Sequence, residues 1–452
     1  MMLNELYIQL GPKDTPAKTA LNKEARSRLL NFIGPFGELD HGIGEVLDQL
    51  NKINVTPSER AVDLLVIAAA VHIADTSTSR SKFSTDGWTR QIGIHVPVSD
   101  KKVWAQTSEH LQRMLKFLTG DYWTFHFRDR PQSHKTLATP SDKLDLSNFD
   151  PVSLFSGGLD SLIGAIDLLG SGRKPLFISH YWDSEASSAQ KALNQGLIKE
   201  YGEASFKVLR ARIGVTKPHL VEAGSEGSQR ARSFLFYSMA AIAADALKTT
   251  DSVLIPENGL IALNVPMDPL RLGSLSTRTA HPFFISSMQK LCADVGMSTK
   301  FENPYRFKTK GEMVAGCSNK KLLKALAPSS MSCSSPAKVR WLGDTPQHCG
   351  YCVPCLIRRA SLKAGLKTKD QTEYYLDDLW DRSLDSKDAE GRDIRSFIYA
   401  ARTLKKKNTK AEYLVRKPGP LPSAEIADYA SVYSRGMAEV AKFLGKVDVK
   451  HG

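Results

Sequence analysis

One hexapeptide carries the residue types that a phosphate-binding loop needs. Residues 156–161 read SGGLDS, after the apolar run VSLF at 152–155 and within the start of a helix-like run that extends to Gly170. Gly157 and Gly158 let the backbone approach a ligand closely. The free N–H groups at the start of the following helix favour an anion. The pattern therefore predicts a pyrophosphate cradle.

The polar side chains of this glycine loop (residues 156–161) refine the prediction. Ser156 and Ser161 add hydroxyl donors, whereas Asp160 would repel a bare phosphate and suits a Mg²⁺ ion placed beside it. No Gly-Lys-Ser/Thr follows, so the loop is not a Walker loop, and the third glycine of the dinucleotide fingerprint is missing. A capped strand-to-helix turn without a ligand is the alternative.

Four cysteines form a second candidate site. They follow the spacing C-x15-C-x2-C-x2-C within residues 331–360. They are Cys333, Cys349, Cys352 and Cys355. Four thiolates so arranged predict a tetrahedral structural Zn²⁺ site, with an iron–sulfur cluster as the alternative. Cys292 and Cys317 lie outside the set and are expected to pack as small apolar side chains.

The elements that position the glycine loop alternate along the chain. From residue 150 onward, strand-like runs are followed by helix-like runs, and the strand-like runs are VSLF (152–155), PLFISHYW (175–182), FKVLRARI (206–213) and DSVL (251–254). This alternation predicts an α/β fold with a doubly wound parallel sheet. Ligands of such sheets bind outside the carboxyl ends of the strands, where the glycine loop lies.

The N-terminal part has a different pattern. Helical periodicity at 58–75 and 100–120 and alternating runs at 88–98 and 122–127 predict an α+β N-terminal domain over residues 1–130. Asp100 and Gly120 are expected to begin and end the second helix. The histidines here look scattered and are expected to be structural; they are His72, His95, His110 and His126.

The remaining segments complete the domain plan. We expect a polar, proline-containing linker at 131–149, the glycine-loop domain at 150–330, the cysteine segment at 331–370 and a helical C-terminal extension at 371–452. The extension contains a basic stretch at 401–417, in which seven Lys or Arg accompany one Glu. Such a run is usually a solvated face.

Composition limits the location and the partners. The chain has 452 residues, a formal net charge of +13 and a pI of about 9.3, which favours polyanionic partners. No motif indicates nucleic acid. The N-terminus lacks the order of a signal peptide, the longest apolar runs are too short to span a bilayer, and six cysteines do not make a disulfide scaffold. We expect a cytoplasmic protein without membrane contact.

These motifs together resemble a known family. SGGLDS after an apolar strand resembles the signature of the PP-loop ATP pyrophosphatases, which have an adenine nucleotide alpha hydrolase-like fold. With the cysteines and the following LIRRAS (356–361), the stretch 150–365 resembles the QueC-like family of 7-cyano-7-deazaguanine synthases. SQRARSFLFYSMAAIAA (228–244) and PYRFKTKGEMV (304–314) are also similar to that family.

The chain departs from QueC in three places. QueC is much shorter, lacks both the N-terminal domain and the C-terminal extension, and has a different substrate loop where this chain has PENGLIALNVPMDP (256–269). With both extensions the chain resembles the QatC family, the QueC-like components of Qat antiviral defence systems in bacteria. This resemblance implies protein partners from the same operon.

The resemblance implies an activity. ATP would adenylate the carboxylate of a 7-carboxy-7-deazaguanine-like substrate and release pyrophosphate, and an amine would then attack the acyl-adenylate. The amine would be ammonia or an amino group of a partner protein. Two alternatives remain at this point: a PP-loop enzyme that modifies tRNA, and a nucleotide-binding scaffold of a defence complex without turnover.

Site residues follow from the same resemblance. The pyrophosphate of ATP would be held, with Mg²⁺, by Ser156, Gly157, Gly158, Asp160 and Ser161. His180 would border the adenosine. Arg230 or Arg232 would neutralise the α-phosphate or the carboxylate during catalysis, together with Asp160 and Ser161. The heterocycle would contact Glu257, Asn258, Arg278 and His281.

Overall fold

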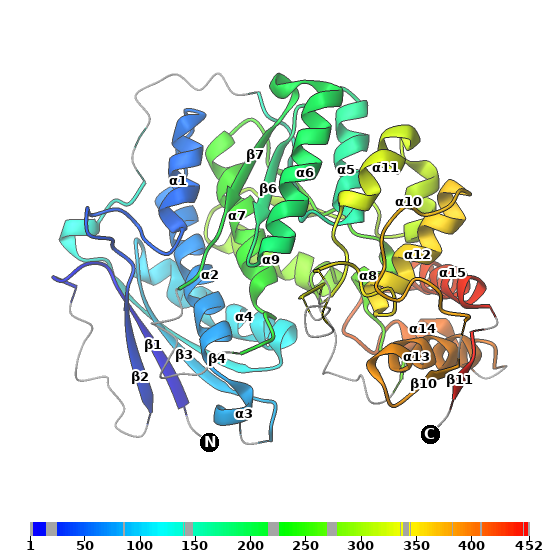
Figure 1. Cartoon of the computed structure of the whole chain (residues 1–452). Coiled ribbons are helices and arrows are strands. Elements are labelled where there is room, and N and C mark those ends of the chain that lie inside the picture. The colour runs from blue at the N-terminus through cyan, green and yellow to red at the C-terminus, as the bar shows by residue number, and fades with distance from the viewer. Residues whose placement is uncertain are drawn as a thin grey trace.

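A computed structural model gives the architecture. It describes residues 3–14, 25–84, 86–138, 140, 148–215, 226–268, 278–334, 336–337, 343, 345–381, 383–406, 409–445 and 447–450. Figure 1 shows an N-terminal sheet at the lower left, a second sheet in the green central part and a helical C-terminal region at the right. Among the described residues, no helix combines the length and apolarity that crossing a membrane requires.

The N-terminal sheet has four strands in the order β2-β1-β3-β4. They are β1 (Leu3–Gln9), β2 (Arg26–Asn31), β3 (Gln91–Val98) and β4 (Tyr122–Asp129). Each described pair is parallel, so the prediction of an α+β domain is wrong and this part is α/β. The reason is that helices separate β2 from β3 and β3 from β4, and such crossovers return the chain in the same direction.

The helices of this part are largely those expected. They are α1 (Ile43–Lys52), α2 (Glu59–Ser77), α3 (Arg80–Phe83) and α4 (Lys101–Thr119). The Asp100 side chain accepts a hydrogen bond from the Val103 N–H, and Gly120 ends α4 with a φ of 83°. Both predicted helix ends are therefore confirmed, because a carboxylate satisfies a free N–H and glycine tolerates the left-handed region.

The second sheet confirms the predicted parallel arrangement. Its strand order is β7-β6-β5-β8-β9, and all its pairs are parallel. The strands are β5 (Val152–Leu154), β6 (Leu176–His180), β7 (Lys207–Ala211), β8 (Ser252–Leu254) and β9 (Lys300–Glu302). The direction in which successive strands are added reverses between β5 and β8, which is the point where ligands bind in such sheets.

Helices cover both faces of this sheet. They are α5 (Leu159–Gly170), α6 (Ser184–Tyr201), α7 (Arg232–Leu247), α8 (Gly259–Leu263) and α9 (Pro282–Asp294). Leu176 and Ile178 of β6 face the core that includes α7, whereas Phe177 between them faces the core that includes α5 and α6. This alternation is the two-residue period of a strand buried on both sides.

The two sheets share one hydrophobic core. That core runs from Leu6 in β1, through the fully buried face of α2, to α7 and to Val152 in β5. Hydrogen bonds also join the parts: among them, the Ala231 N–H donates to Asp75 Oδ2 at 2.8 Å, and the Glu226 N–H donates to the Thr76 carbonyl. The N-terminal part is therefore packed against the second sheet as part of the same body.

The region expected to be a linker is partly described. After the 3₁₀ turn Gln132–His134, the N–H groups of Leu137 and Ala138 donate to the Glu59 carboxylate. Residues 139 and 141–147 lie outside the described residues. The described beginning of this region is thus fixed to the start of α2.

The predicted extension at 371–452 is mainly helical, as expected. Its helices are α13 (Ala389–Leu404), α14 (Ala411–Leu414) and α15 (Ile426–Leu444), and its strand β10 (Leu384–Asp385) pairs with β11 (Val449–Lys450). The helices α10 (Lys310–Gly316), α11 (Lys320–Leu326) and α12 (Val353–Leu366) precede it and complete the C-terminal region. Short 3₁₀ turns lie at Glu203–Ser205, Ala327–Ser329 and Ser423–Glu425. Leu356, Phe397 and Tyr433 belong to a separate core that holds α12, α13 and α15 together.

Candidate functional site

The glycine loop connects β5 to α5 at the carboxyl edge of the second sheet. Gly157 has a φ of 88°, and a Cβ there would lie 3.1 Å from Gln190 Cγ. The positive φ favours glycine, and a Cβ would also crowd the Gln190 side chain. Ser156 is exposed, and its Oγ accepts from the Gly158 N–H at 3.3 Å. Ser161 donates to the Gly158 carbonyl at 2.9 Å. The loop is therefore compact, with one hydroxyl directed over its N–H groups.

Asp160 is the buried centre of a polar cluster behind the loop. Its Oδ2 accepts from the backbone N–H of Asn258 at 3.1 Å and from the Asn258 side chain at 2.7 Å. Its Oδ1 forms an ion pair with Lys310 Nζ at 3.1 Å, and both side chains are buried. Asp160 thus attaches two later segments, one at Asn258 and one at Lys310, to the first turn of α5.

The carboxyl groups of Asp160 and Glu257 titrate as a pair. Burial alone would raise the pKa of Asp160, but Lys310 and hydrogen bonds from Glu257 and Asn258 outweigh it and lower this pKa. Burial and the charge of Asp160 raise the pKa of Glu257 well above its usual value. Glu257 is therefore a neutral acid that donates to the ionised Asp160.

The two carboxylate oxygens of Asp160 differ in what they contact, which bears on its expected Mg²⁺ role. A Mg²⁺ ligand needs a carboxylate oxygen directed at the ion. Oδ2 of Asp160 is occupied by Asn258, whereas Oδ1 is buried, forms the ion pair with Lys310 and accepts no hydrogen bond among the described residues. The Asp160 carboxylate therefore helps to hold the glycine loop in place, and the expected Mg²⁺ role of Oδ1 stays a prediction.

A segment that leads into the cysteines lies directly on the glycine loop. The Met331 N–H donates to the Gly157 carbonyl at 2.9 Å, and the Leu159 N–H donates to Ser332 Oγ at 3.3 Å. Ser332 is itself held, since its N–H donates to His348 Nε2 at 3.1 Å. We call Met331–Ser332 the clasp. Cys333 follows it immediately.

The four cysteines converge as predicted. Their sulfurs lie within 4.8 Å of one another, with Cys333–Cys352 and Cys349–Cys355 separations of 3.9 Å. Four ligands at a Zn–S distance of about 2.3 Å form a tetrahedron with edges of about 3.8 Å. The cluster could therefore hold a single ion such as zinc, and it is too tight to enclose an iron–sulfur cluster of several irons.

His180 and Arg232 meet at the carboxyl end of β6. Arg232 Nε donates to His180 Nδ1 at 3.2 Å, and Arg232 also donates to the His180 carbonyl at 3.0 Å. Since a guanidinium only donates, the ring proton of His180 lies on Nε2. In the described part of the chain, no carboxylate lies within 4 Å of Arg232. This half-buried cation is suited to an anionic ligand.

Three other predicted residues are held elsewhere by their described contacts. Arg230 lies over the Trp88 ring at 4.4 Å. Arg278 lies over the Phe117 ring at 4.6 Å and donates to the Phe117 carbonyl. His281 caps α9, accepting at Nδ1 from the Phe283 N–H. The structure brings Glu257 and Asn258 to Asp160, but it places Arg278 and His281 against α4.

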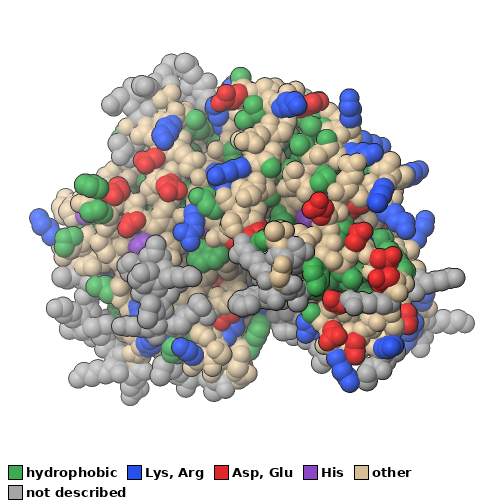
Figure 2. Space-filling view, in the orientation of Figure 1, with side chains coloured by type: hydrophobic (Ala, Val, Ile, Leu, Met, Phe, Trp, Pro, Cys, Tyr) green, Lys and Arg blue, Asp and Glu red, His purple; other side chains and the backbone are tan. Residues whose placement is uncertain are grey.

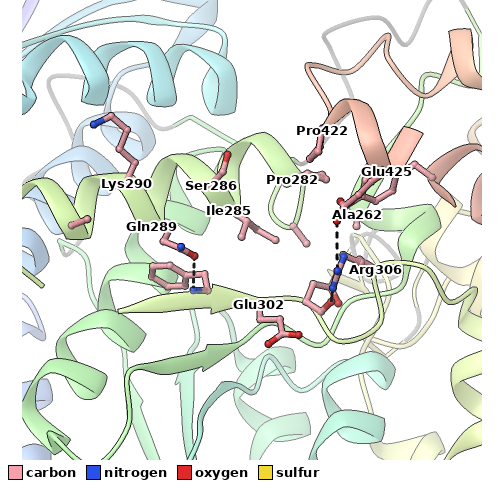
Figure 3. A pocket seen from close by; sticks show the side chains of 15 residues that line it. Ala262, Pro282, Ile285, Ser286, Gln289, Lys290, Glu302, Arg306, Pro422 and Glu425 are labelled. Atoms are coloured by element: carbon pink, nitrogen blue, oxygen red, sulfur yellow. Dashed lines mark hydrogen bonds and ion pairs between the residues drawn. The ribbon is translucent and has the colours of Figure 1, made fainter. Parts of the chain in front are cut away.

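A cavity of about 500 Å³ opens between α9, β9 and the C-terminal region. Figure 3 shows Ile285, Ser286 and Gln289 of α9 along one side and the ion pair between Arg306 and Glu425, at 3.6 Å, across another. Asn303 lines the cavity and donates to the Glu257 carbonyl at 2.8 Å. The cavity therefore adjoins the Asp160 cluster through one residue.

Two site residues escaped the sequence reasoning. Lys310 lies in a stretch noted only for its family likeness, and its pairing with Asp160 depends on the fold. Ser332 next to a cysteine carries no signal of its own. A lysine between Thr309 and an apolar helix was the available hint, because a buried lysine needs a carboxylate partner.

On the face shown in Figure 2, the described Lys and Arg side chains are interspersed with acidic ones and do not form a continuous basic stripe. Lys407 and Asn408 of the predicted basic stretch lie outside the described residues.

Two comparisons with known proteins gave no match. No protein-family model matches it, and no curated protein matches it significantly. What can be said of the chain therefore comes from its own structure, which is an α/β protein with two larger parallel sheets, a two-stranded one and a four-cysteine cluster.

Proposed function

We propose that the chain is a QueC-like, ATP-dependent enzyme that activates a carboxylate by adenylation and transfers it to an amine. The observation that carries this proposal is the position of the glycine loop. It lies at the carboxyl end of β5, where the order of the second sheet reverses, and beneath the clasp. The neighbouring end of β6 is contacted by Arg232 of α7, which has no carboxylate within 4 Å among the described residues.

The residues support a division of labour. The Gly158 N–H now faces the hydroxyl Ser156 Oγ, and a phosphate oxygen can replace such an acceptor. The Leu159 N–H would stay bonded to Ser332 Oγ, so that the clasp keeps the loop in its nucleotide-binding shape. Arg232 would contact the α-phosphate, where charge grows during adenylation. Asp160 does not touch the nucleotide in this proposal; through Asn258 and Lys310 it keeps the loop in shape.

The proposed chemistry balances as two substitutions. A carboxylate oxygen of a 7-carboxy-7-deazaguanine-like base attacks the α-phosphorus of ATP, and the bond to the bridging oxygen breaks to release pyrophosphate. An amine nitrogen then attacks the acyl carbon, AMP leaves and the amine loses a proton. The acceptor is ammonia or an amino group of a protein from the same defence operon. The base would occupy the cavity beside Asn303.

The test is pyrophosphate release by the full chain with ATP, Mg²⁺ and 7-carboxy-7-deazaguanine. We expect base-dependent AMP and pyrophosphate in equal amounts. Arg232→Gln should reduce the rate by about 10- to 100-fold, because a charge-assisted hydrogen bond contributes about 1.5–3 kcal/mol. Arg173→Gln, on an exposed arginine paired with Asp150, is the matched control and should leave the rate unchanged.

Each outcome bears on a different class of protein. ATP binding without turnover, with the base and with operon proteins present, would overturn the enzyme and leave the nucleotide-binding scaffold. Turnover only with tRNA would replace the base by a nucleic-acid substrate. A mass increase on an operon protein would identify the amine.

A further inference from the structure

The side chains of Glu5, His95 and His126, from three neighbouring strands, meet on one face of the N-terminal sheet. His95 of β3 is in register with His126 of β4 and with Tyr7 of β1. Glu5 lies two residues before Tyr7 in β1 and so faces the same side. Histidines that look scattered in the sequence are thus neighbours, because parallel strands align residues from segments far apart.

The three potential ligand atoms are close together. One oxygen of Glu5 and one ring nitrogen each from His95 and His126 lie within 4.8 Å of one another. Glu5 Oε1 is 3.6 Å from His95 Nε2. Tyr7 donates its hydroxyl to the other oxygen, Glu5 Oε2, at 2.6 Å. This second contact orients the Glu5 carboxylate and leaves Oε1 directed at the imidazoles.

Glu5 has no lysine or arginine partner among the described residues. It is only 5% exposed, and burying an ionised carboxylate is costly unless a cation accompanies it. In the described part of the chain, no lysine or arginine nitrogen lies within 4 Å of it. The buried Nε2 of His95, which faces Glu5, likewise has no hydrogen-bond partner there.

We propose that Glu5, His95 and His126 form a second metal site, which binds one divalent first-row transition ion. Two imidazoles and one carboxylate are the donor set of zinc enzymes and of non-haem iron(II) centres. A second cation would supply the charge that Glu5 lacks. The site differs in kind from the cysteine cluster, whose four thiolates would saturate a tetrahedral ion.

One of the two histidine rings would have to turn for both to bind the same ion. The rings of His95 and His126 are stacked at 4.3 Å with an angle of 12° between their planes, and one ion cannot lie in both planes. His126 is exposed and has room to turn about its χ2 bond. Three protein ligands leave coordination positions open for water or a small anion. The proposal does not depend on the QueC-like activity.

The test uses the full chain with Co²⁺ as the probe. Co²⁺ bound by thiolates shows sulfur-to-metal charge-transfer bands, whereas Co²⁺ bound by imidazole and carboxylate does not. We expect one equivalent with these bands and a second without them. His126→Gln and Glu5→Gln should each weaken the second equivalent at least tenfold, in line with the losses seen when metal-site partners are removed. His134→Gln, outside the cluster, is the control.

The variants distinguish a metal site from a cluster of side chains that merely pack together. His126 is exposed, so its replacement leaves the core intact and the thiolate-bound equivalent reports folding. Binding of a single equivalent by the wild-type chain would overturn the proposal, as would a second equivalent that persists unchanged in both variants. Zn²⁺ and Fe²⁺ competition against Co²⁺ then identifies the ion that the site prefers.

Discussion

At the scale of single residues, the Asp160–Glu257 pair shows how burial divides two similar groups. The positive charge of Lys310 and the donors of Asn258 favour the ionised form of Asp160, while the neighbouring negative charge favours the neutral form of Glu257. One proton shared in this way lets two carboxyl groups lie together in a buried site. The loop above them therefore depends on a protonation state.

Replacing Glu257 tests this dependence. The pKa of Glu257 is raised in the folded chain, so the stability it contributes is complete below its unfolded pKa and is lost as pH rises through its folded pKa. Glu257→Gln removes that proton. We expect the variant to gain stability relative to wild type as the pH rises above the unfolded pKa of Glu257, by at most about 1.4 kcal/mol per pH unit, until the folded pKa is passed. Thermal unfolding across this range measures the difference.

A substitution of an exposed glutamate is the control for this experiment. Glu302→Gln changes an exposed carboxyl at the end of β9 and should follow the wild-type pH profile. A constant offset between Glu257→Gln and wild type at every pH would contradict the protonated state of Glu257.

The candidate site was predictable to the extent that its signals are local. The turn chemistry of SGGLDS and the cysteine spacing lie within short windows, and the structure shows the loop and the cluster where they were expected. Lys310 was missed because its partner is 150 residues away. Arg278 and His281 were misplaced because only the packing of α4 against α9 directs them to Phe117.

At the scale of elements, helix ends depend on local sequence signals, whereas strand pairing depends on distant segments. Helices such as α4 carry their own caps, so their ends were predictable. Strand β9 has only three residues and gives no periodic signal. The direction of strands in the N-terminal sheet depends on which strands pair, and a pattern of alternating residues does not specify pairing.

The clasp makes an element-scale prediction about metal and nucleotide. Ser332→Ala removes the hydroxyl that accepts from the Leu159 N–H. We expect ATP to bind about two- to tenfold more weakly, since one hydrogen bond contributes about 0.5–1.5 kcal/mol. The metal content of the cysteine cluster should not change. Isothermal titration and metal analysis of the same sample measure both.

Metal removal should act through the same segment. Cys333→Ser frees the residue that follows the clasp, and we expect a larger loss of ATP affinity than in Ser332→Ala. Ser329→Ala, on an exposed serine of the preceding turn, is the control. Equal ATP affinity in all three variants would show that the cysteine cluster and the glycine loop are uncoupled.

At the scale of the whole molecule, a buried ion network lies where the N-terminal part meets α7. Arg80 and Arg90 both bind Asp121, at 2.8 and 2.7 Å, and Arg90 also binds Asp75. Asp75 in turn accepts from the Ala231 N–H at the start of α7. The network thus determines how the helix that bears Arg232 is seated.

Removing one member should destabilise the chain strongly. Asp121→Ala leaves two buried guanidinium groups without their shared partner, and such losses cost about 3–5 kcal/mol. We expect a large fall in the urea midpoint of unfolding. Asp129→Ala, at the exposed end of β4, should shift it little. A small effect of Asp121→Ala would show that the arginines find other partners.

Gln49 on α1 covers part of the edge of the second sheet. Its side-chain amide donates to the Arg210 carbonyl at 3.0 Å and accepts from the Arg210 N–H at 2.9 Å, on the edge strand β7. One side chain thereby occupies backbone groups to which a foreign strand would pair. A truncated chain lacking residues before 148 would present this edge, and it should self-associate into β-rich aggregates even where its own core still folds.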